Sequence, residues 1–321
     1  MIFQKQIEKK YKENLFSRQD ETKDIFYFSS ADFEGLKKEA FAFSAEAGHI
    51  LQGWFYHYDA PIKDRLIIFD HGMGCGHRAY MKEIEMLARH GYLVFAYDHT
   101  GCAKSAGEST NGFAQSLSDL DACITALKND EEYKALSISV MGHSWGAFAA
   151  MNICAIHPDV THIVAMSGFI SVGAILAQNF SGPLSIFYQS IYDIETKANP
   201  KYAHYQAQES LKNTDAKVLI IHSTDDKIVK AQNHYNILRY ALTTKPNIRF
   251  LTVNHKGHNP NYTVDAVNYK DAFFTDLTAK RKKNLLPSDE EKVLYAESFD
   301  WHRMTAQDDK VWAEIFRTLD A

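Results

Sequence analysis

The stretch SVMGHSWGAFAAMNI, Ser139–Ile153, decides the fold, because its centre at residues 142–146 is the pentapeptide GHSWG, a match to G-x-S-x-G. The preceding run LSISVM, residues 136–141, is short, apolar and β-branched, and predicts a buried strand. The Ala-rich run after Ser144 predicts a helix that ends at Pro158. We therefore expect Ser144 at a tight junction between a strand and a helix.

Such a junction explains both glycines of the pentapeptide. Side chains at Gly142 and Gly146 would collide with the neighbouring strand and helix, and Ser144 must adopt a strained backbone that lifts its hydroxyl clear of the sheet. The alternative is a glycine-lined turn that carries an idle serine. The pentapeptide alone leaves that alternative open.

The composition is that of an ordinary globular protein. The 321 residues are 45% apolar and 23% charged, with a formal net charge of −5. These values allow a sizeable core, as one large domain or a domain with an insertion, and they do not indicate a nucleic-acid-binding protein. We interpret the basic cluster at residues 280–283 as a solvated helix end.

The cysteines and the amino-terminal residues indicate the cellular compartment of the protein. Four cysteines without CxxC spacing indicate a reduced, cytoplasmic protein with neither a disulfide framework nor a zinc site. The first 16 residues, MIFQKQIEKKYKENLF, lack the apolar segment of a signal peptide. We expect no cofactor and no metal.

Apolar runs alternate with amphipathic segments along the chain, which predicts a parallel sheet covered by helices on both faces. An antiparallel hairpin at the edge of the sheet is expected over residues 39–59, because this segment alternates in period two around Ala47-Gly48. The remaining strands are expected at residues 65–72, 92–101, 136–141, 162–168, 217–226 and 248–255, and helices at 78–91 and 115–130.

One region breaks this alternation. Residues 160–192 carry no Asp, Glu, Lys or Arg, but polar residues and Pro183 interrupt the run, so we expect no transmembrane span. We expect instead a helical cap inserted after the sixth strand. Its large apolar and aromatic side chains could line a substrate pocket or only pack the cap onto the core; the candidates are Phe180, Leu184, Phe187, Tyr188 and Tyr192.

Ligands of open α/β sheets bind beyond the carboxyl ends of the strands, so three further strand ends matter. The first, HGMGCG at residues 71–76, is a Gly-rich loop whose Met73 N–H could pair with the Trp145 N–H as an oxyanion hole. The second, STDDKIV at 223–229, offers two adjacent acids, and the third, HKGHNPNY at 255–262, offers two histidines.

Serine is a poor nucleophile near neutral pH, so a neutral imidazole must take its proton and a carboxylate must orient that imidazole. The chain order serine, acid, histidine is the one expected for this kind of sheet. The acid is Asp225 or Asp226, and the base is His255 or His258. An idle serine would not be accompanied by a Gly loop, an acid and a histidine at three further strand ends.

The chain resembles the α/β-hydrolase superfamily, and most closely its branch of monoacylglycerol lipases, lysophospholipases and serine-aminopeptidase-like esterases. The motifs that carry the resemblance are DHGMGCGHRAY, VFAYDHTGCAKSAGES, VMGHSWGAF, IIHSTDDKIV and NHKGHN. The resemblance implies a mostly parallel eight-stranded sheet with helices on both faces. It also selects Asp226 over Asp225 and His258 over His255.

The sequence departs from the family pattern in three places. Ala103 stands where the family has a second glycine, and Ser223 stands where it usually has a glycine. Some forty extra residues follow the histidine loop, with a clear helix start at residues 287–291; they could cover the pocket mouth, form an interface or merely pack on an edge. We expect a core of residues 1–169 and 216–321, with an N-terminal helical extension over 1–38, and a cap of residues 170–215.

These observations predict a serine hydrolase that cleaves carboxylic esters with a small to medium apolar acyl group through an acyl-enzyme. Ser144, Asp226 and His258 are the expected catalytic residues, Met73 and Trp145 the oxyanion hole, and the substrate-binding residues are expected to be Phe180, Phe187, Tyr188 and Tyr192. The alternatives are a peptidase or amidase, with Asp193 or Glu195 holding the substrate amine, and a ligand-binding protein without turnover. We expect no nucleic-acid partner; transient contact with a lipid interface and a homodimer stay open.

Overall fold

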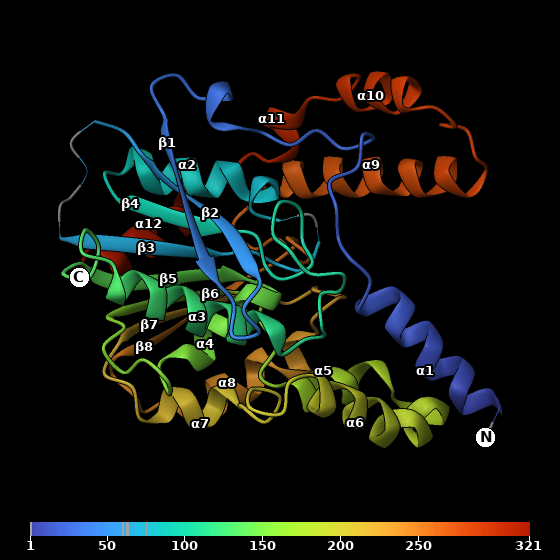
Figure 1. Cartoon of the computed structure of the whole chain (residues 1–321), viewed down its shortest axis with the longest axis horizontal. Helices are drawn as coiled ribbons and strands as arrows, with labels where there is room; N and C mark the ends of the chain where they lie inside the picture. The colour runs from blue at the N-terminus through green and yellow to red at the C-terminus, as the bar shows by residue number, and fades with distance from the viewer. Residues whose placement is uncertain (1, 60, 62–63, 75) are drawn as a thin grey trace.

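The computed structural model describes residues 2–59, 61, 64–74 and 76–321, and Figure 1 shows its arrangement. The strands are β1 (Lys37–Ser44), β2 (Ile50–His57), β3 (Arg65–Asp70), β4 (Leu93–Tyr97), β5 (Ser137–His143), β6 (His162–Met166), β7 (Lys217–Ser223) and β8 (Ile248–Val253). The α-helices are α1 (Ile2–Leu15), α2 (Met81–Arg89), α3 (Gln115–Asn129), α4 (Trp145–Ile153), α5 (Val172–Asn179), α6 (Tyr188–Ala198), α7 (Ala207–Lys212), α8 (Tyr235–Leu242), α9 (Val264–Lys282), α10 (Asp289–Glu297), α11 (Trp301–Met304) and α12 (Asp309–Leu319). Short 3-10 helices are η1 (Ser30–Asp32), η2 (His77–Tyr80), η3 (Gly182–Phe187) and η4 (Ala231–Asn233).

The strands form one sheet in the order β1-β2-β4-β3-β5-β6-β7-β8. The β1–β2 hairpin is antiparallel and pairs antiparallel with β4, and the strands from β4 to β8 run parallel. This confirms the eight-stranded, mostly parallel sheet and its edge hairpin. Because the central strands are parallel, their carboxyl ends lie at one edge, where β3, β5, β7 and β8 lead into the four predicted loops.

The central strands are buried on both faces, which explains their uninterrupted apolar sequence. In β3, Leu66 and Ile68 belong to the core beneath α3 and α4, whereas Ile67 and Phe69 belong to the core beneath α2 and α12. Alternate side chains of one strand thus serve two cores, as the pleat requires.

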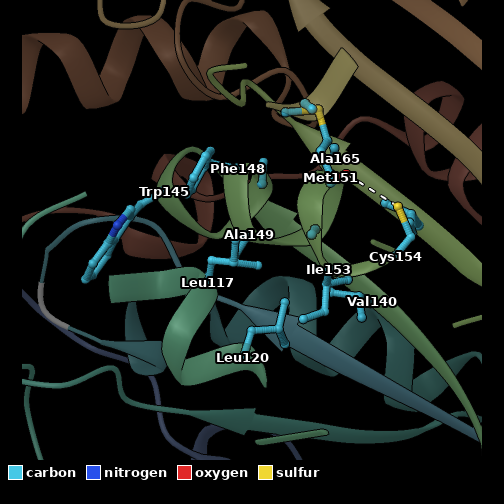
Figure 2. Close-up of a cluster of buried hydrophobic side chains, with 14 of the residues drawn as sticks. Leu117, Leu120, Val140, Trp145, Phe148, Ala149, Met151, Ile153, Cys154 and Ala165 are labelled. Carbon is cyan, nitrogen blue, oxygen red and sulfur yellow. Dashed lines mark hydrogen bonds between the residues drawn. The ribbon is translucent and has the colours of Figure 1, made fainter. Parts of the chain in front are cut away.

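Helix α4 is itself fully buried, between the sheet and α3. Figure 2 shows this cluster: Leu117 and Leu120 of α3 face Ala149 and Ile153 of α4, over Val140 of β5. A helix buried on all sides must be apolar all round, as the Ala-rich sequence of α4 is. Its packing fixes the position of the turn that precedes it.

The predicted cap consists of α5, η3 and α6, and α1 packs against it (Figure 1). Phe3 and Tyr11, which are eight residues apart and share one side of α1, face the cap. Phe3 contacts Phe187 of η3, and Tyr11 contacts Phe180. The Tyr11 hydroxyl donates to Glu195 Oε1 at 2.5 Å. Helix α7, which lies within the range of residues 170–215 predicted as the cap, packs against α4 and α8.

After β8 the chain leaves the sheet and returns only with its last helix. Helices α9, α10 and α11 lie together at one end of the molecule (Figure 1), around a small apolar cluster. Helix α10 begins with a capping box between Ser288 and Glu291, which confirms the predicted helix start. Helix α12 then packs on β6 and β7.

The entry and exit of this α9–α11 excursion lie side by side. The Thr263 N–H donates to the Ala306 carbonyl at 2.9 Å, and the Asp308 N–H donates to the Asn261 carbonyl at 2.8 Å. The excursion is therefore closed at its base by backbone hydrogen bonds.

Candidate active site

Ser144 lies in the turn between β5 and α4, as predicted. Its backbone has φ 55° and ψ −109°, a conformation that costs a non-glycine residue roughly 1–3 kcal/mol. The Ser144 N–H donates to the Met166 carbonyl at 2.8 Å, which ties the turn to β6. Ser144 is the only residue from Met141 to Ala150 that is not buried, so the strained turn presents its side chain while its neighbours are enclosed.

The two glycines of the pentapeptide are required by close backbone contacts. A Cβ on Gly142 would lie 2.4 Å from the Gly146 carbonyl oxygen, and a Cβ on Gly146 would lie 2.0 Å from the Asp70 carbonyl oxygen. Both separations are far below van der Waals contact. The predicted collisions with the neighbouring strand and helix are confirmed.

Asp226 and His258 lie together beyond the ends of β7 and β8. Asp226 Oδ2 is 2.8 Å from His258 Nδ1, and Asp226 Oδ1 accepts the N–H groups of Ile228 at 2.9 Å and Val229 at 3.0 Å. Burial opposes ionisation of Asp226, but the hydrogen bond and charge of His258 outweigh it and hold the pKa of the carboxyl below its usual value. Asp226 is therefore an ionised partner for an imidazole N–H.

The neighbouring acid, Asp225, has a different position. Its Oδ1 accepts the Ser223 hydroxyl at 2.5 Å and the N–H groups of Lys256 and Gly257, each at 3.3 Å. Asp225 thus holds the backbone of the loop that carries His258. Ser223, the residue that departs from the family pattern, takes part in this support.

Ser144 and His258 line one cavity of about 680 Å³, together with Met73. The other histidine candidate, His255, is an exposed residue of the same cavity, with φ 59°. Of the two histidine candidates, His258 is the one that contacts a candidate acid, Asp226; His222 Nε2 also lies 3.4 Å from Asp226 Oδ2.

Of the two predicted oxyanion donors, Met73 lines this cavity, and Trp145 directly follows its lining residue Ser144. Trp145 is the first residue of α4, so its N–H has no carbonyl partner within the helix. Its side chain is buried and anchored, since Nε1 donates to the Phe113 carbonyl at 2.6 Å. Met73 lies in the loop after β3 and lines the cavity; Cys75 of this loop lies outside the described residues.

Sequence reasoning did not find His143 and Tyr80, which connect the three loops. His143 Nε2 lies 2.6 Å from the His258 carbonyl oxygen, and Tyr80 Oη lies 2.9 Å from His143 Nδ1 and 3.2 Å from the Gly72 nitrogen. Burial, with the nearby His258 charge, lowers the pKa of His143 to about 3. A neutral His143 with its proton on Nε2 completes the chain Gly72 N–H, Tyr80 O–H, His143 N–H and His258 carbonyl. The position of His143 inside G-x-S-x-G was the only available signal.

A second buried network lies beneath the Gly-rich loop. His99 is fully buried between Asp70, 2.5 Å from its Nε2, and Asp119, 3.2 Å from its Nδ1. Burial alone would lower the pKa of His99, but the two carboxylates outweigh it and raise this pKa to about 9. A charged His99 therefore joins the end of β3, from which the loop with Met73 departs, to α3.

None of the four predicted substrate-binding aromatics lines the cavity that holds Ser144. Phe180 and Phe187 contact α1, and Tyr188 stacks on Tyr192 with 5.9 Å between ring centroids. Their apolar character predicted that these side chains would be covered, but α1 contacts Phe180 and Phe187, and the two tyrosines contact each other.

The cavity is bounded instead by loops and by α9. Its apolar wall includes Met73, Ile228, Val267 and Phe274, and its charged groups include Lys227, Lys270 and Asp271. The excursion after β8 therefore contributes directly to the site.

Two features are absent from the described part of the chain, a metal-binding cluster and a membrane-spanning helix. No group of three or more His, Cys, Asp or Glu residues there could hold a metal ion. No helix among these residues has the length and apolarity needed to cross a lipid bilayer.

Similarity to known proteins agrees with this geometry. The family described as "Serine aminopeptidase, S33" matches residues 61–203, which is less than half of the chain. Among solved structures, an esterase from Pyrococcus furiosus superposes with a TM-score of 0.60 at 18% identity, covering 83% of this chain and 98% of that one. The chain has the α/β-hydrolase fold and is similar to members of that superfamily.

Two curated relatives match part of the chain. The chain is 33% identical to the monoglyceride lipase of Rattus norvegicus over 118 residues, which are 36% of each chain. It is 26% identical to a monoglyceride lipase homolog of monkeypox virus over 113 residues, 34% of this chain and 40% of the viral protein. The chain thus spans two fifths or less of the length of these relatives.

Proposed function

We propose that this α/β-hydrolase is a serine hydrolase that cleaves carboxylic esters through an acyl-enzyme. Ser144 attacks the ester carbonyl, and His258 accepts the serine proton. Asp226 orients the imidazole and stabilises the imidazolium that forms. The N–H groups of Met73 and Trp145 stabilise the oxyanion, and each such donor is worth about 3 kcal/mol of barrier in other serine hydrolases.

In the second half of the reaction, His258 returns the proton to the leaving alcohol and then activates water against the acyl-enzyme. The observation that carries the proposal is the position of His258: its Nδ1 lies 2.8 Å from the buried Asp226 carboxylate, and its side chain shares a cavity with the strained Ser144. A serine in an idle turn would have no need of such a partner.

The choice of an ester rests on the named relatives and on the cavity. The two curated relatives are a monoglyceride lipase and a homolog of one, and the solved structure is called an esterase. The apolar wall of the cavity and its volume of about 680 Å³ support an acyl group of small to medium length.

The amidase alternative is weakened by the position of its two candidate carboxylates. A peptidase needs a carboxylate that binds the substrate amine, but Glu195 is fully buried and accepts hydrogen bonds from Tyr11 and the Phe113 N–H. Asp193 is an exposed residue that accepts a hydrogen bond from Gln189. Neither carboxylate lines the cavity that holds Ser144.

Labelling with a fluorophosphonate probe tests the proposal. The wild-type protein should take one label, and Ser144→Ala should take none while retaining its thermal unfolding midpoint. Turnover of p-nitrophenyl butyrate should follow the same pattern. A folded wild-type protein that takes no label, or label that persists in Ser144→Ala, would contradict the mechanism. Binding of the ester without turnover over hours would favour a non-catalytic ligand-binding protein.

A further inference from the structure

One face of α9 forms a wall of the cavity beside Ser144 and His258. The residues of this face, Val267, Lys270, Asp271 and Phe274, stand at positions i, i+3, i+4 and i+7, which share one side of a helix. Two are apolar and two carry opposite charges. The charged pair can therefore select the polar part of a substrate that reaches Ser144.

Lys270 is held close to the catalytic loop. Its Nζ donates to Asn259 Oδ1 at 3.0 Å, and Asn259 directly follows His258 in the chain. The ammonium also lies over the ring of the buried Tyr262, 5.0 Å from the ring centroid. An ammonium has three N–H donors, and the hydrogen bond to Asn259 uses one of them.

Within the described ranges, no carboxylate oxygen lies within 4.0 Å of Lys270 Nζ, although the side chain is only partly exposed. Burial lowers the pKa of Lys270, and the more distant charges of Glu83 and Asp271 partly offset this effect. Glu83 is buried, and its Oε1 accepts the Asn261 amide at 2.9 Å; neither of its oxygens forms an ion pair with Lys270. A desolvated cation without a contacting anion is costly unless a ligand supplies one.

The other charged groups of the cavity do not play the same role. Asp225 is bound to the backbone of the His258 loop, and Lys227 and Asp271 are exposed to solvent. Among the charged residues that line the cavity, the partly buried one is therefore positive. An anion suits this position better than an amine does.

We propose that Lys270 binds an anionic group of the substrate, a carboxylate or a phosphate, so that the preferred ester carries a negative charge. This inference rests on the proposed ester hydrolysis. The anion could belong to the acyl part, as in a half-ester of a dicarboxylic acid, or to the alcohol part, as in an acylated glycerol phosphate. In both cases the Lys270 ammonium pairs with it while Ser144 attacks the carbonyl.

Two matched substrate pairs test the inference and locate the anion. The acyl pair is p-nitrophenyl hemiglutarate against p-nitrophenyl valerate, and the alcohol pair is 1-butyrylglycerol 3-phosphate against 1-butyrylglycerol. We expect the wild-type protein to prefer the anionic member of one pair in kcat/KM. Lys270→Met should lower kcat/KM for that member about 10-fold or more, since a hydrogen bond to a charged group contributes on this scale. Its effect on the neutral member should be clearly smaller, because only the hydrogen bond to Asn259 is lost there.

Three control variants sharpen this comparison. Lys270→Arg should keep most of the preference, because it keeps the charge. Lys282→Met, an exposed lysine on the same helix and outside the cavity, should change neither substrate pair. If Lys227→Met removes the preference and Lys270→Met does not, the assignment to Lys270 is wrong. The inference is also overturned if the wild type prefers neither anionic substrate, or if Lys270→Met lowers both members of a pair equally.

A binding measurement separates this inference from the proposed reaction. Glutarate or glycerol 3-phosphate should raise the thermal unfolding midpoint of the wild type and of Ser144→Ala, because a ligand stabilises the folded state it binds. Lys270→Met should lose that shift. A protein that hydrolyses neutral esters but shows no such shift would contradict the inference alone, whereas a protein with the shift but without fluorophosphonate labelling would contradict only the proposed reaction.

Discussion

His143 holds the backbone of His258, with 2.6 Å between His143 Nε2 and the His258 carbonyl oxygen. The residue directly before Ser144 thus positions the loop of the candidate base. Tyr80, which donates to the other nitrogen of His143, also accepts from the Gly72 N–H. Three loops that are distant in the chain are therefore connected through two side chains.

Tyr80→Phe should weaken this connection without removing any proposed catalytic group. We expect kcat on p-nitrophenyl butyrate to fall about 3- to 10-fold. The variant loses the two hydrogen bonds of the hydroxyl, each worth about 0.5–1.5 kcal/mol, but they act on catalysis only through the loops. KM should change less, since the hydroxyl acts through His143 and the Gly72 amide. Tyr80→Ala, which also removes the ring, should lower the thermal unfolding midpoint further. An unchanged kcat in a folded Tyr80→Phe variant would contradict the positioning role.

Substitution of the two adjacent acids, Asp225 and Asp226, should lower kcat by very different factors. Asp226→Asn should lower kcat about 10³- to 10⁴-fold. The amide oxygen would stay with the Ile228 and Val229 N–H groups, and the amide NH2 would donate to His258 Nδ1, which favours the wrong tautomer and removes the charge that stabilises the imidazolium. Asp225→Asn should lower kcat about 10-fold at most, because it weakens only the hydrogen bonds that support the loop backbone. Steady-state kinetics on one ester, with circular dichroism as the folding control, checks both variants. Equal losses in the two variants would show that the acids are not distinguished in this way.

The buried His99 makes the folded state sensitive to alkaline pH. Its pKa is raised above the unfolded value, to about 9, so its contribution to stability is complete below about pH 6.5 and is lost as the pH rises through about 9. Between pH 7.5 and 8.5 we expect the free energy of unfolding to fall by roughly 1 kcal/mol, since the folded state retains a proton that the unfolded chain has released. Urea denaturation at the two pH values measures this difference.

Between pH 7.5 and 8.5, the loss of stability from His99 is nearly free of an opposite pH dependence that arises from other buried histidines. Buried neutral histidines such as His71 and His143 have pKa values lowered to about 3, and they favour the folded state as the pH rises through about 6.5. Above pH 7.5 that gain is almost complete, so the remaining slope reports on His99. His99→Gln should unfold more easily at both values and lose most of the slope. A stability that stays level or rises from pH 7.5 to 8.5 in the wild type would contradict a charged His99.

The sheet and the nucleophile turn could be predicted because their signals are local. A β-branched apolar run followed by two closely spaced glycines fits few backbone arrangements other than a tight strand–turn–helix junction. The structure shows why the glycines are needed, since Gly142 lies against the Gly146 carbonyl and Gly146 against the Asp70 carbonyl. The choice between Asp225 and Asp226 was not local. Residue chemistry left it open, since both acids follow the same strand, and only the position of His258 distinguishes them.

The walls of the site could not be predicted for a different reason. Apolar character shows that Phe180 and Phe187 will be covered, but not which segment covers them, and here that segment is α1. Lys270 was inconspicuous in the sequence, because a lysine in a polar helix is normally a solvated one. Its importance depends on the excursion after β8, which brings α9 to the cavity.

The closed base of this α9–α11 excursion has a consequence for how such a protein can change. Because the chain departs at Thr263 and rejoins at Ala306 through one pair of backbone contacts, the intervening helices form an exchangeable module. Ser144, Asp226 and His258 all precede it in the chain. Substrate selectivity could therefore change through substitutions in this module while Ser144, Asp226 and His258 stay the same.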